Sequence, residues 1–327
     1  MTTYSDQWVV SRRGPRNAVD PKRPYQFLIE QERTGPGEVV LVATIFLTNR
    51  ECPWRCLMCD LWKNTLAHSV SQGDIPAQIE FALERLGRDA SPYPRQIKLY
   101  NSGSFFDAAA IPPGDYAAIA RLVGKFERVI VESHPALIGP RALEFAEMLR
   151  SEPGLETGRP TRLEVAMGLE TVHPEVLPRL NKRMTLEMFS GAAEFLREDE
   201  IDMRAFVLLK PPFLSEEEGL IWAQRSVEFA FDCGATAVSV IPVRRGNGAL
   251  EEVGFQEPRL QSLESGVAAA IALGRGRVFA DLWDLARFSD CGACFEARQA
   301  RLHRMNLSQS VEPPIECAEC QTILTLR

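Results

Sequence analysis

From Val39 onward, stretches that resemble β-strands alternate with stretches that resemble α-helices. The expected strands span residues 39–47, 96–101, 128–133, 162–169, 203–210 and 237–243. The expected helices, with apolar residues at helical spacing, span about residues 76–87, 114–124, 139–150, 185–198, 216–232 and 258–273. This alternation predicts an α/β fold in which parallel strands are joined by right-handed crossovers. Ligands of such sheets bind at the carboxyl ends of the strands.

Three cysteines follow the first of these strands within eight residues, which we call the Cys loop (residues 52–59). Cys52, Cys56 and Cys59 have the spacing Cys-x3-Cys-x2-Cys. Three thiolates on one short loop can bind three irons of a [4Fe-4S] cube and leave the fourth iron open to a small molecule. The natural candidate is S-adenosylmethionine (SAM), whose amino and carboxylate groups can chelate that iron. A zinc site or three buried structural thiols are the alternatives, but zinc would want a fourth ligand nearby.

The bulk composition is that of a globular protein of 327 residues, with 45% hydrophobic and 25% charged residues. The net charge of −7 disfavours a general binder of nucleic acids or anionic membranes. No signal peptide is visible, and the apolar run at 39–47 is too short to cross a bilayer, so we expect a cytoplasmic protein. Eight cysteines in a reducing compartment indicate metal binding rather than disulfides. Cys233, which stands apart, is expected to be a small core residue.

Polar residues at the ends of the expected strands are candidates for holding a cofactor. The turn Asn101-Ser102-Gly103-Ser104 follows the second strand, and its small residues would let the backbone approach a ligand closely, although it could be a plain turn. Glu132 and Glu170 end the third and fourth strands, where a carboxylate can bind ribose hydroxyls or an ammonium group. A structural ion pair with an arginine is the competing interpretation. His134 is expected to pack in a turn, and Ile241 belongs to a buried strand.

The C-terminal part contains two Cys-x2-Cys pairs separated by 22 residues. We call these the tail cysteines: Cys291, Cys294, Cys317 and Cys320. Paired Cys-x2-Cys motifs suit a closed tetrahedral zinc site, but the same four thiolates could hold an auxiliary [4Fe-4S] cluster. Arg298, Arg301, His303 and Arg304 lie between the pairs and predict a basic helix face, either solvated or in contact with a ligand.

Beyond the Cys loop, the stretches LYNSGSFFD, VESHP, MGLET, KPPFLSE and PVRRGNGALE resemble the elongator/MiaB-like branch of the radical SAM superfamily. The resemblance covers about residues 39–327 and is strongest to the radical SAM subunit of archaeosine synthesis and its relatives. It implies a partial (β/α)6 TIM-like barrel and a radical SAM enzyme with a [4Fe-4S] cluster. It also places SAM against the turn at 101–104, which lacks the glutamate of the family's Gly-Gly-Glu-like turn. Met58 stands where the family often has an aromatic residue against adenine, and Ile241 matches the apolar edge under adenine.

The resemblance further implies a substrate and partners. In that family, radical chemistry cleaves a lysine adduct on a 7-deazaguanine base of tRNA, after a partner enzyme has attached the lysine. A reducing electron donor would also be needed. Arginines that could bind tRNA phosphate occur in the N-terminal arm, after the sixth strand and in the tail: Arg12, Arg13, Arg16, Arg23, Arg244, Arg245, Arg298, Arg301 and Arg304, with Lys22. A radical enzyme acting on a free metabolite or peptide, and a non-enzymatic metal scaffold, remain the alternatives.

Three segments are expected. Residues 1–37 form an irregular arm rich in arginine, proline and glycine. Residues 38–275 form the radical SAM core domain, and residues 276–327 form a small Cys-rich metal-binding extension.

Overall fold

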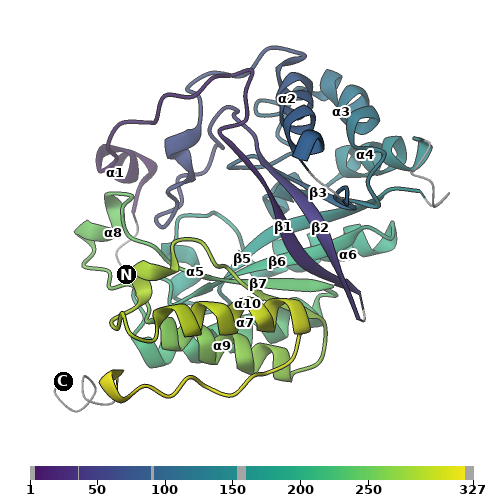
Figure 1. The fold of residues 1–327 in the computed structure, drawn as a ribbon. Coiled ribbons are helices and arrows are strands. Elements are labelled where there is room, and N and C mark those ends of the chain that lie inside the picture. Colours follow the sequence, from purple (N-terminus) through teal and green to yellow (C-terminus); the bar gives the residue numbers. More distant parts are fainter. Residues whose placement is uncertain (1–3, 36, 90–91, 153–159, 321–327) are drawn as a thin grey trace.

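A computed structural model describes residues 4–35, 37–89, 92–152 and 160–320. Parts of the three expected segments therefore lie outside the described residues: residues 1–3 and 36 of the arm, 90–91 and 153–159 of the core domain, and 321–327 of the extension. The strands form one curved sheet in the order β1 to β8 (Figure 1). They are β1 (Gln26–Gly35), β2 (Glu38–Phe46), β3 (Gln96–Tyr100), β4 (Arg128–Ser133), β5 (Arg162–Glu170), β6 (Asp202–Leu209), β7 (Ala237–Pro242) and β8 (Arg277–Ala280).

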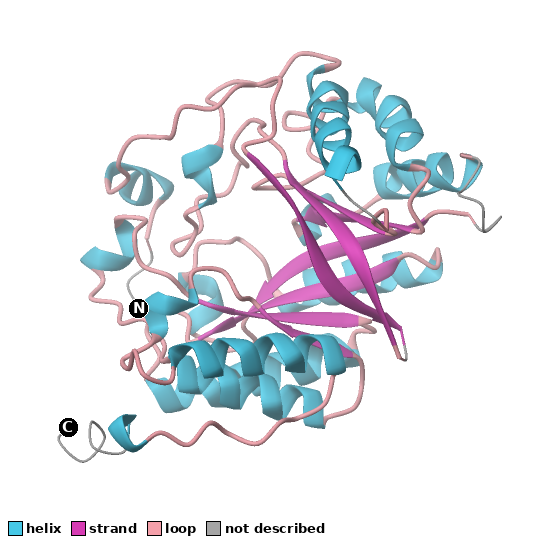
Figure 2. Ribbon diagram, in the orientation of Figure 1, coloured by secondary structure: helices cyan, strands magenta, loops and turns pink. Residues whose placement is uncertain are grey.

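The longer helices cover the outer face of this sheet, as Figure 2 shows in cyan around the magenta strands. The helices are α1 (Asp6–Ser11), α2 (Asp74–Asp89), α3 (Tyr116–Val123), α4 (Pro140–Ser151), α5 (Val176–Arg179), α6 (Leu186–Glu198), α7 (Glu216–Asp232), α8 (Ala249–Glu252), α9 (Leu260–Ala272) and α10 (Phe295–Ser308). The short helices α1 and α8 lie apart from the strands. At the start of α7, Ser215 and Glu218 form a reciprocal capping box, which satisfies backbone donors at the helix terminus. None of the described helices is long and apolar enough to span a membrane.

The partial barrel predicted from the sequence is confirmed, and the six expected strands coincide with β2 to β7 to within about a residue at each end. Strands β2 to β8 are all parallel. The prediction of an irregular N-terminal arm is wrong in part, because the arm contains α1 and the long strand β1, which pairs antiparallel with β2. The sheet also continues after the expected last helix into β8, so the segment expected to be only a metal-binding extension supplies a strand.

Two side-chain amides, from Asn306 of α10 and from Gln309 directly after it, occupy the open edge of β8. Asn306 accepts from the Ala280 N–H (2.8 Å) and donates to its carbonyl (2.9 Å). Gln309 binds the N–H and carbonyl of Val278 in the same way, at 2.7 and 2.8 Å. These amides replace the hydrogen bonds that a further strand would make, so the sheet ends here without an unpaired edge. Strands β1 and β8 are the two edges of the sheet, and we call the opening between them the barrel seam. On the β1 side of this seam, the Leu307 carbonyl of α10 accepts from Arg33 (3.3 Å).

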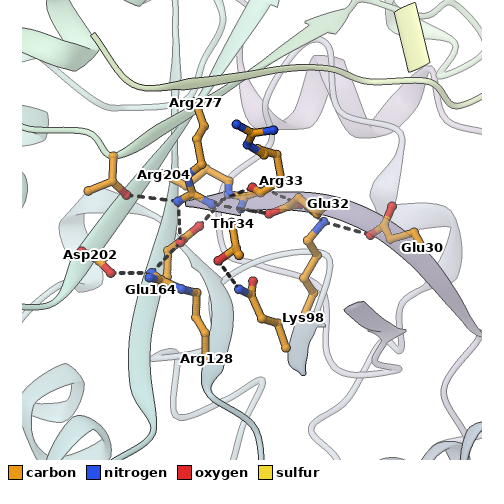
Figure 3. Close-up of polar contacts among 12 residues, drawn as sticks. Glu30, Glu32, Arg33, Thr34, Lys98, Arg128, Glu164, Asp202, Arg204 and Arg277 are labelled. Carbon is orange, nitrogen blue, oxygen red and sulfur yellow. Dashed lines mark hydrogen bonds and ion pairs between the residues drawn. The ribbon is translucent and has the colours of Figure 1, made fainter. Parts of the chain in front are cut away.

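A charged network fills the barrel at the amino ends of the parallel strands (Figure 3). Arg204 lies between two carboxylates, with Nη2 2.6 Å from Glu32 and Nε 2.7 Å from Glu164. Lys98 contacts Glu32 at 2.5 Å. The remaining charged members are Glu30, Arg128, Asp202 and Arg277. Because acids and bases balance, satisfied ion pairs occupy this end of the barrel, which leaves the carboxyl ends of the strands as the expected place for a ligand.

Candidate active site

The Cys loop lies between β2 and α2 without regular secondary structure, and neighbouring loops hold it in place. The amide of Asn247, after β7, donates to the carbonyls of Leu57 (2.7 Å) and Cys59 (3.3 Å). The Leu57 N–H donates to the carbonyl of Leu180, after β5 (2.8 Å). Loops far apart in the sequence therefore fix the backbone that carries the cysteines. The buried amide of Asn247 had no recognisable signal in the sequence.

The three thiols of the Cys loop lie close enough to affect one another's pKa. Burial raises the pKa of Cys56 to about 12, and the Cys52 thiol adds to the rise. Burial also raises the pKa of Cys59 well above its usual value, reinforced by Cys56 and Cys52. Thiols in such a site are deprotonated by metal binding, which supplies the missing positive charge. Three thiolates on one short loop suit a cluster in which each thiolate binds its own iron.

The turn after β3 lies directly against the Cys loop. A side chain at Gly103 would meet the Cβ of Cys52 at 3.0 Å, so only glycine fits without displacement. Glu132 holds this turn, since its Oε1 accepts from the Asn101 N–H (2.6 Å) and the Gly103 N–H (3.4 Å). The side-chain amide of Asn101 is fully buried, yet neither its oxygen nor its nitrogen has a partner. Such orphaned groups are rare, and a bound ligand would supply the partners that this amide lacks.

Glu170 and Lys182 form a buried ion pair beside the Cys loop. Glu170 has a positive φ of 65°, at a bulge at the end of β5. A side chain at Gly168 would collide with both partners, so glycine leaves the space in which they meet. Burial by itself lowers the pKa of Lys182, but Glu170 and Cys56 outweigh it and raise the pKa above its usual value. Lys182 is not among the residues predicted for this site, because a lysine in a loop is usually exposed.

The other expected contacts lie around the same loop. His134 stacks on Trp54 with ring centroids 3.7 Å apart, and its Nε2 is 3.0 Å from the Lys182 carbonyl. Burial lowers the pKa of His134 to about 3, so the ring is neutral, as a packing residue should be. Met58 and Ile241 both pack, partly exposed, against an apolar cluster that includes Leu57 and Leu180. All the expected cofactor contacts therefore surround the Cys loop, and their roles remain predictions.

The N-terminal arm crosses the side of the barrel that carries the Cys loop, α5 and α8 (Figure 1). Arg13 and Arg16 both bind Glu51, which precedes the first cysteine, at 2.5 Å. Asp6 of α1 accepts from the amide of Asn181 (2.8 Å). Arg13 and Arg16 therefore fasten the arm to the Cys loop, which argues against their use as free phosphate ligands.

A set of aromatic side chains lines the barrel interior on the carboxyl-end side of the charged network. Tyr100 lies 6.1 Å from both Phe46 and Phe206, measured between ring centroids. These side chains belong to inward-facing strand positions yet remain partly exposed, so the barrel is open at this level. Trp283, after β8, lies 6.2 Å from Phe46 and is 48% exposed. Period-two alternation in the strands is the sequence signal that could have identified Phe46 and Tyr100.

The tail cysteines come together at one place, although two of them precede α10 and two follow it in the chain. Their four sulfur atoms all lie within 4.8 Å of one another. The expected basic helix face is wrong for two of its members, because Arg298 and Arg301 are 6% and 4% exposed and bind Glu264 of α9. His303 and Arg304 are exposed, and Arg304 pairs with Glu312. The buried arginines are therefore unavailable to tRNA.

No family model matches the chain. An uncharacterized protein of Methanocaldococcus jannaschii is 23% identical over 254 residues, which are 74% of this chain and 66% of that protein. The archaeosine synthase subunit beta of Methanosarcina acetivorans is 27% identical over 228 residues, which are 66% of this chain and 62% of that protein. The chain thus matches less than two thirds of the length of each of these relatives.

The structure is also similar to that of methylornithine synthase (PylB). The TM-score is 0.52 at 12% identity, and the match covers 97% of this chain and 86% of that one. This likeness confirms the predicted barrel fold. The sequence motifs resemble those of the radical SAM subunit of archaeosine synthesis, and the similarity to archaeosine synthase subunit beta confirms that resemblance.

Proposed function

We propose that this chain is a radical SAM enzyme in which Cys52, Cys56 and Cys59 hold a [4Fe-4S] cluster. The observation that carries the proposal is that the half-buried thiols of Cys52, Cys56 and Cys59 share one loop, which lies against the 101–104 turn and beside the ion pair of Lys182 and Glu170. When bound, the cluster supplies the electron that cleaves SAM into methionine and a 5'-deoxyadenosyl radical.

The surrounding residues have groups that match the parts of SAM. The Lys182 ammonium lies beside Cys56 and suits the methionyl carboxylate, while Glu170 suits the amino group or a ribose hydroxyl. The orphaned amide of Asn101 offers both a donor and an acceptor. Glu132 acts by holding the 101–104 turn in contact with the Cys loop. Met58 and Ile241 supply apolar surface for adenine.

For the substrate, we infer a modified nucleobase in tRNA, cleaved at a lysine adduct as in archaeosine formation. The support is the similarity to archaeosine synthase subunit beta, a name that also suggests a partner subunit. The partly exposed aromatic rings of Tyr100, Phe46 and Phe206 suit a planar base, because every base can stack on such rings. Exposed cations on the same side of the barrel are available for phosphate: Arg12, Lys22, Arg23 and Arg245.

The test is anaerobic assay of the reconstituted protein for 5'-deoxyadenosine, with a chemical reductant and with or without bulk tRNA. We expect SAM cleavage that tRNA stimulates, and none when all three Cys-loop cysteines are replaced by alanine. Cleavage stimulated by a metabolite or peptide and not by tRNA would contradict the substrate. A complete lack of SAM cleavage by protein that carries its cluster would contradict the enzyme and leave a metal scaffold.

A further inference from the structure

The tail cysteines form a compact site away from the proposed SAM site. The Cys291 and Cys317 sulfurs are 3.9 Å apart, and the Cys294 and Cys320 sulfurs are 3.4 Å apart. Cys291, Cys294 and Cys320 are buried, so the sulfurs face one another and not solvent. One pair lies at the start of α10, and the other lies beyond its end, on the segment that returns along it.

We propose that this site binds one zinc ion. Four thiolates held tetrahedrally at about 2.3 Å from zinc place their sulfurs about 3.8 Å apart, close to the distances observed. In a [4Fe-4S] cube each thiolate binds its own iron, so the four thiolates must stand around the outside of eight atoms. Four sulfurs within 4.8 Å of one another leave no room for that arrangement. The distances therefore favour a single ion over an auxiliary cluster.

Arg298 supports the site from outside the ligand set. Its Nε lies 3.1 Å from the Cys294 sulfur, and its Nη2 lies 3.2 Å from the Ile315 carbonyl on the returning segment. Its Nη1 pairs with Glu264 of α9. Four thiolates around a divalent ion carry two net negative charges, and a buried guanidinium that donates to one of them offsets part of this charge. Arg298 is thus a positioning residue that also anchors the site to α9.

The zinc site would fix the helix that closes the barrel seam. The returning segment is tied to α10 by Arg301, which donates to the carbonyls of Pro313 (2.8 Å) and Glu312 (2.6 Å). The same helix carries Asn306, and Gln309 follows it directly; the amides of both residues cover the edge of β8. The ion would join the residues just before α10 to the end of the returning segment. Its loss should therefore loosen the part of that segment at 309–316 first. This role does not depend on the proposed SAM chemistry.

Metal analysis of the full-length protein tests the proposal. We expect about one zinc per chain in the wild type and in the variant with alanine at Cys52, Cys56 and Cys59, and none in Cys317→Ser/Cys320→Ser. Zinc-edge X-ray absorption of the wild type, which needs no variant, should show four sulfur ligands. Iron that remains in the triple-alanine variant, with no zinc, would overturn the proposal in favour of a cluster. Two disulfides between the tail cysteines in anaerobically purified protein would overturn it as well.

A matched pair of variants tests the role of Arg298. Arg298→Gln should release zinc to a chelator at least about tenfold faster than the wild type, as is typical when a residue supporting the ligands is lost. Arg304→Gln, in the same helix but exposed and paired with Glu312, should release it at the wild-type rate. Limited proteolysis should then cut between residues 309 and 316 only after zinc removal. Equal release rates for the two variants would contradict the role of Arg298. Proteolysis between residues 309 and 316 at the same rate with and without zinc would contradict the proposal that zinc holds this segment in place.

Discussion

The ammonium of Lys182 and the carboxylate of Glu170 form a buried ion pair in the space that Gly168 leaves free, beside Cys56. The lysine comes from the loop after α5 and the glutamate from the bulged end of β5. Each is the other's counter-ion in the absence of a ligand. A zwitterionic ligand such as the methionyl group of SAM would offer a carboxylate to the lysine and an ammonium to the glutamate, so the pair is suited to open and receive it.

Replacing Glu170 by Gln should affect both stability and SAM binding. The variant leaves Lys182 buried without its counter-ion, which should lower the free energy of unfolding by about 3–5 kcal/mol. SAM binding should weaken by about 1.5–3 kcal/mol, because a charge-assisted hydrogen bond is lost. Urea denaturation and equilibrium SAM binding measure the two effects.

The double variant Glu170→Gln/Lys182→Met separates the effect on stability from the effect on SAM binding. It removes both charges, so we expect most of the stability to return while SAM binding stays weak. Restored SAM binding in the double variant would assign the pair to structure alone.

Alanine at Cys52, Cys56 or Cys59 should abolish 5'-deoxyadenosine formation, because a cube held by two thiolates lacks a ligand. The loop lies at the open end of the barrel, so circular dichroism should stay close to that of the wild type. Cys233→Ala is the control, since this residue lies outside both cysteine groups and should keep its iron and its activity. An active single-alanine variant would refute the assignment of that cysteine.

The charged network should make stability depend on pH through Glu164. Burial raises the pKa of this group, but Arg204, Arg277 and Arg128 outweigh it and lower the pKa from 4.5 to about 2. A lowered pKa contributes stability that is fully present above pH 4.5 and is lost as the pH falls toward about 2. Glu164→Gln should therefore be less stable than the wild type by about 3–5 kcal/mol at neutral pH. The difference should shrink as the pH falls from about 4.5 to about 2, as urea denaturation at several pH values would reveal. A constant difference would contradict the assignment.

Binding of tRNA should depend on Arg245, which is exposed on the loop after β7 and lies 3.8 Å from Glu251. Arg245→Ala should lower the slope of log affinity against log salt by about one phosphate contact. Arg244 is a poorer probe than the sequence suggested, because it binds Asp281 and the Trp283 carbonyl at 2.7 Å and holds that loop. Arg304→Ala is the control on the far helix. Salt-independent binding by the wild type would contradict the nucleic-acid substrate.

Local patterns in the sequence determined much of the fold and the proposed chemistry. Alternation of apolar residues with periods of two and 3.6 indicates strands and helices wherever they occur, so β2 to β7 were predicted closely. The spacing of Cys52, Cys56 and Cys59 is likewise local, because one short loop carries all three. Strand β1 escaped prediction because it lies in a segment whose arginines, prolines and glycines suggest irregular structure. It becomes a strand through its pairing with β2.

Only the tertiary structure decided which distant side chains meet, because contacts between loops depend on the closing of the barrel. Lys182 could not be assigned to the Cys loop until the loops after β2 and β5 were brought together. Arg298 looked like a surface residue until α9 supplied Glu264 and the returning tail covered it. The choice between one ion and a cluster at the tail cysteines also depends on distances between sulfurs, which spacing along the chain does not determine. Burial and long-range pairing are properties of the folded chain, and the sequence constrains them only through the fold.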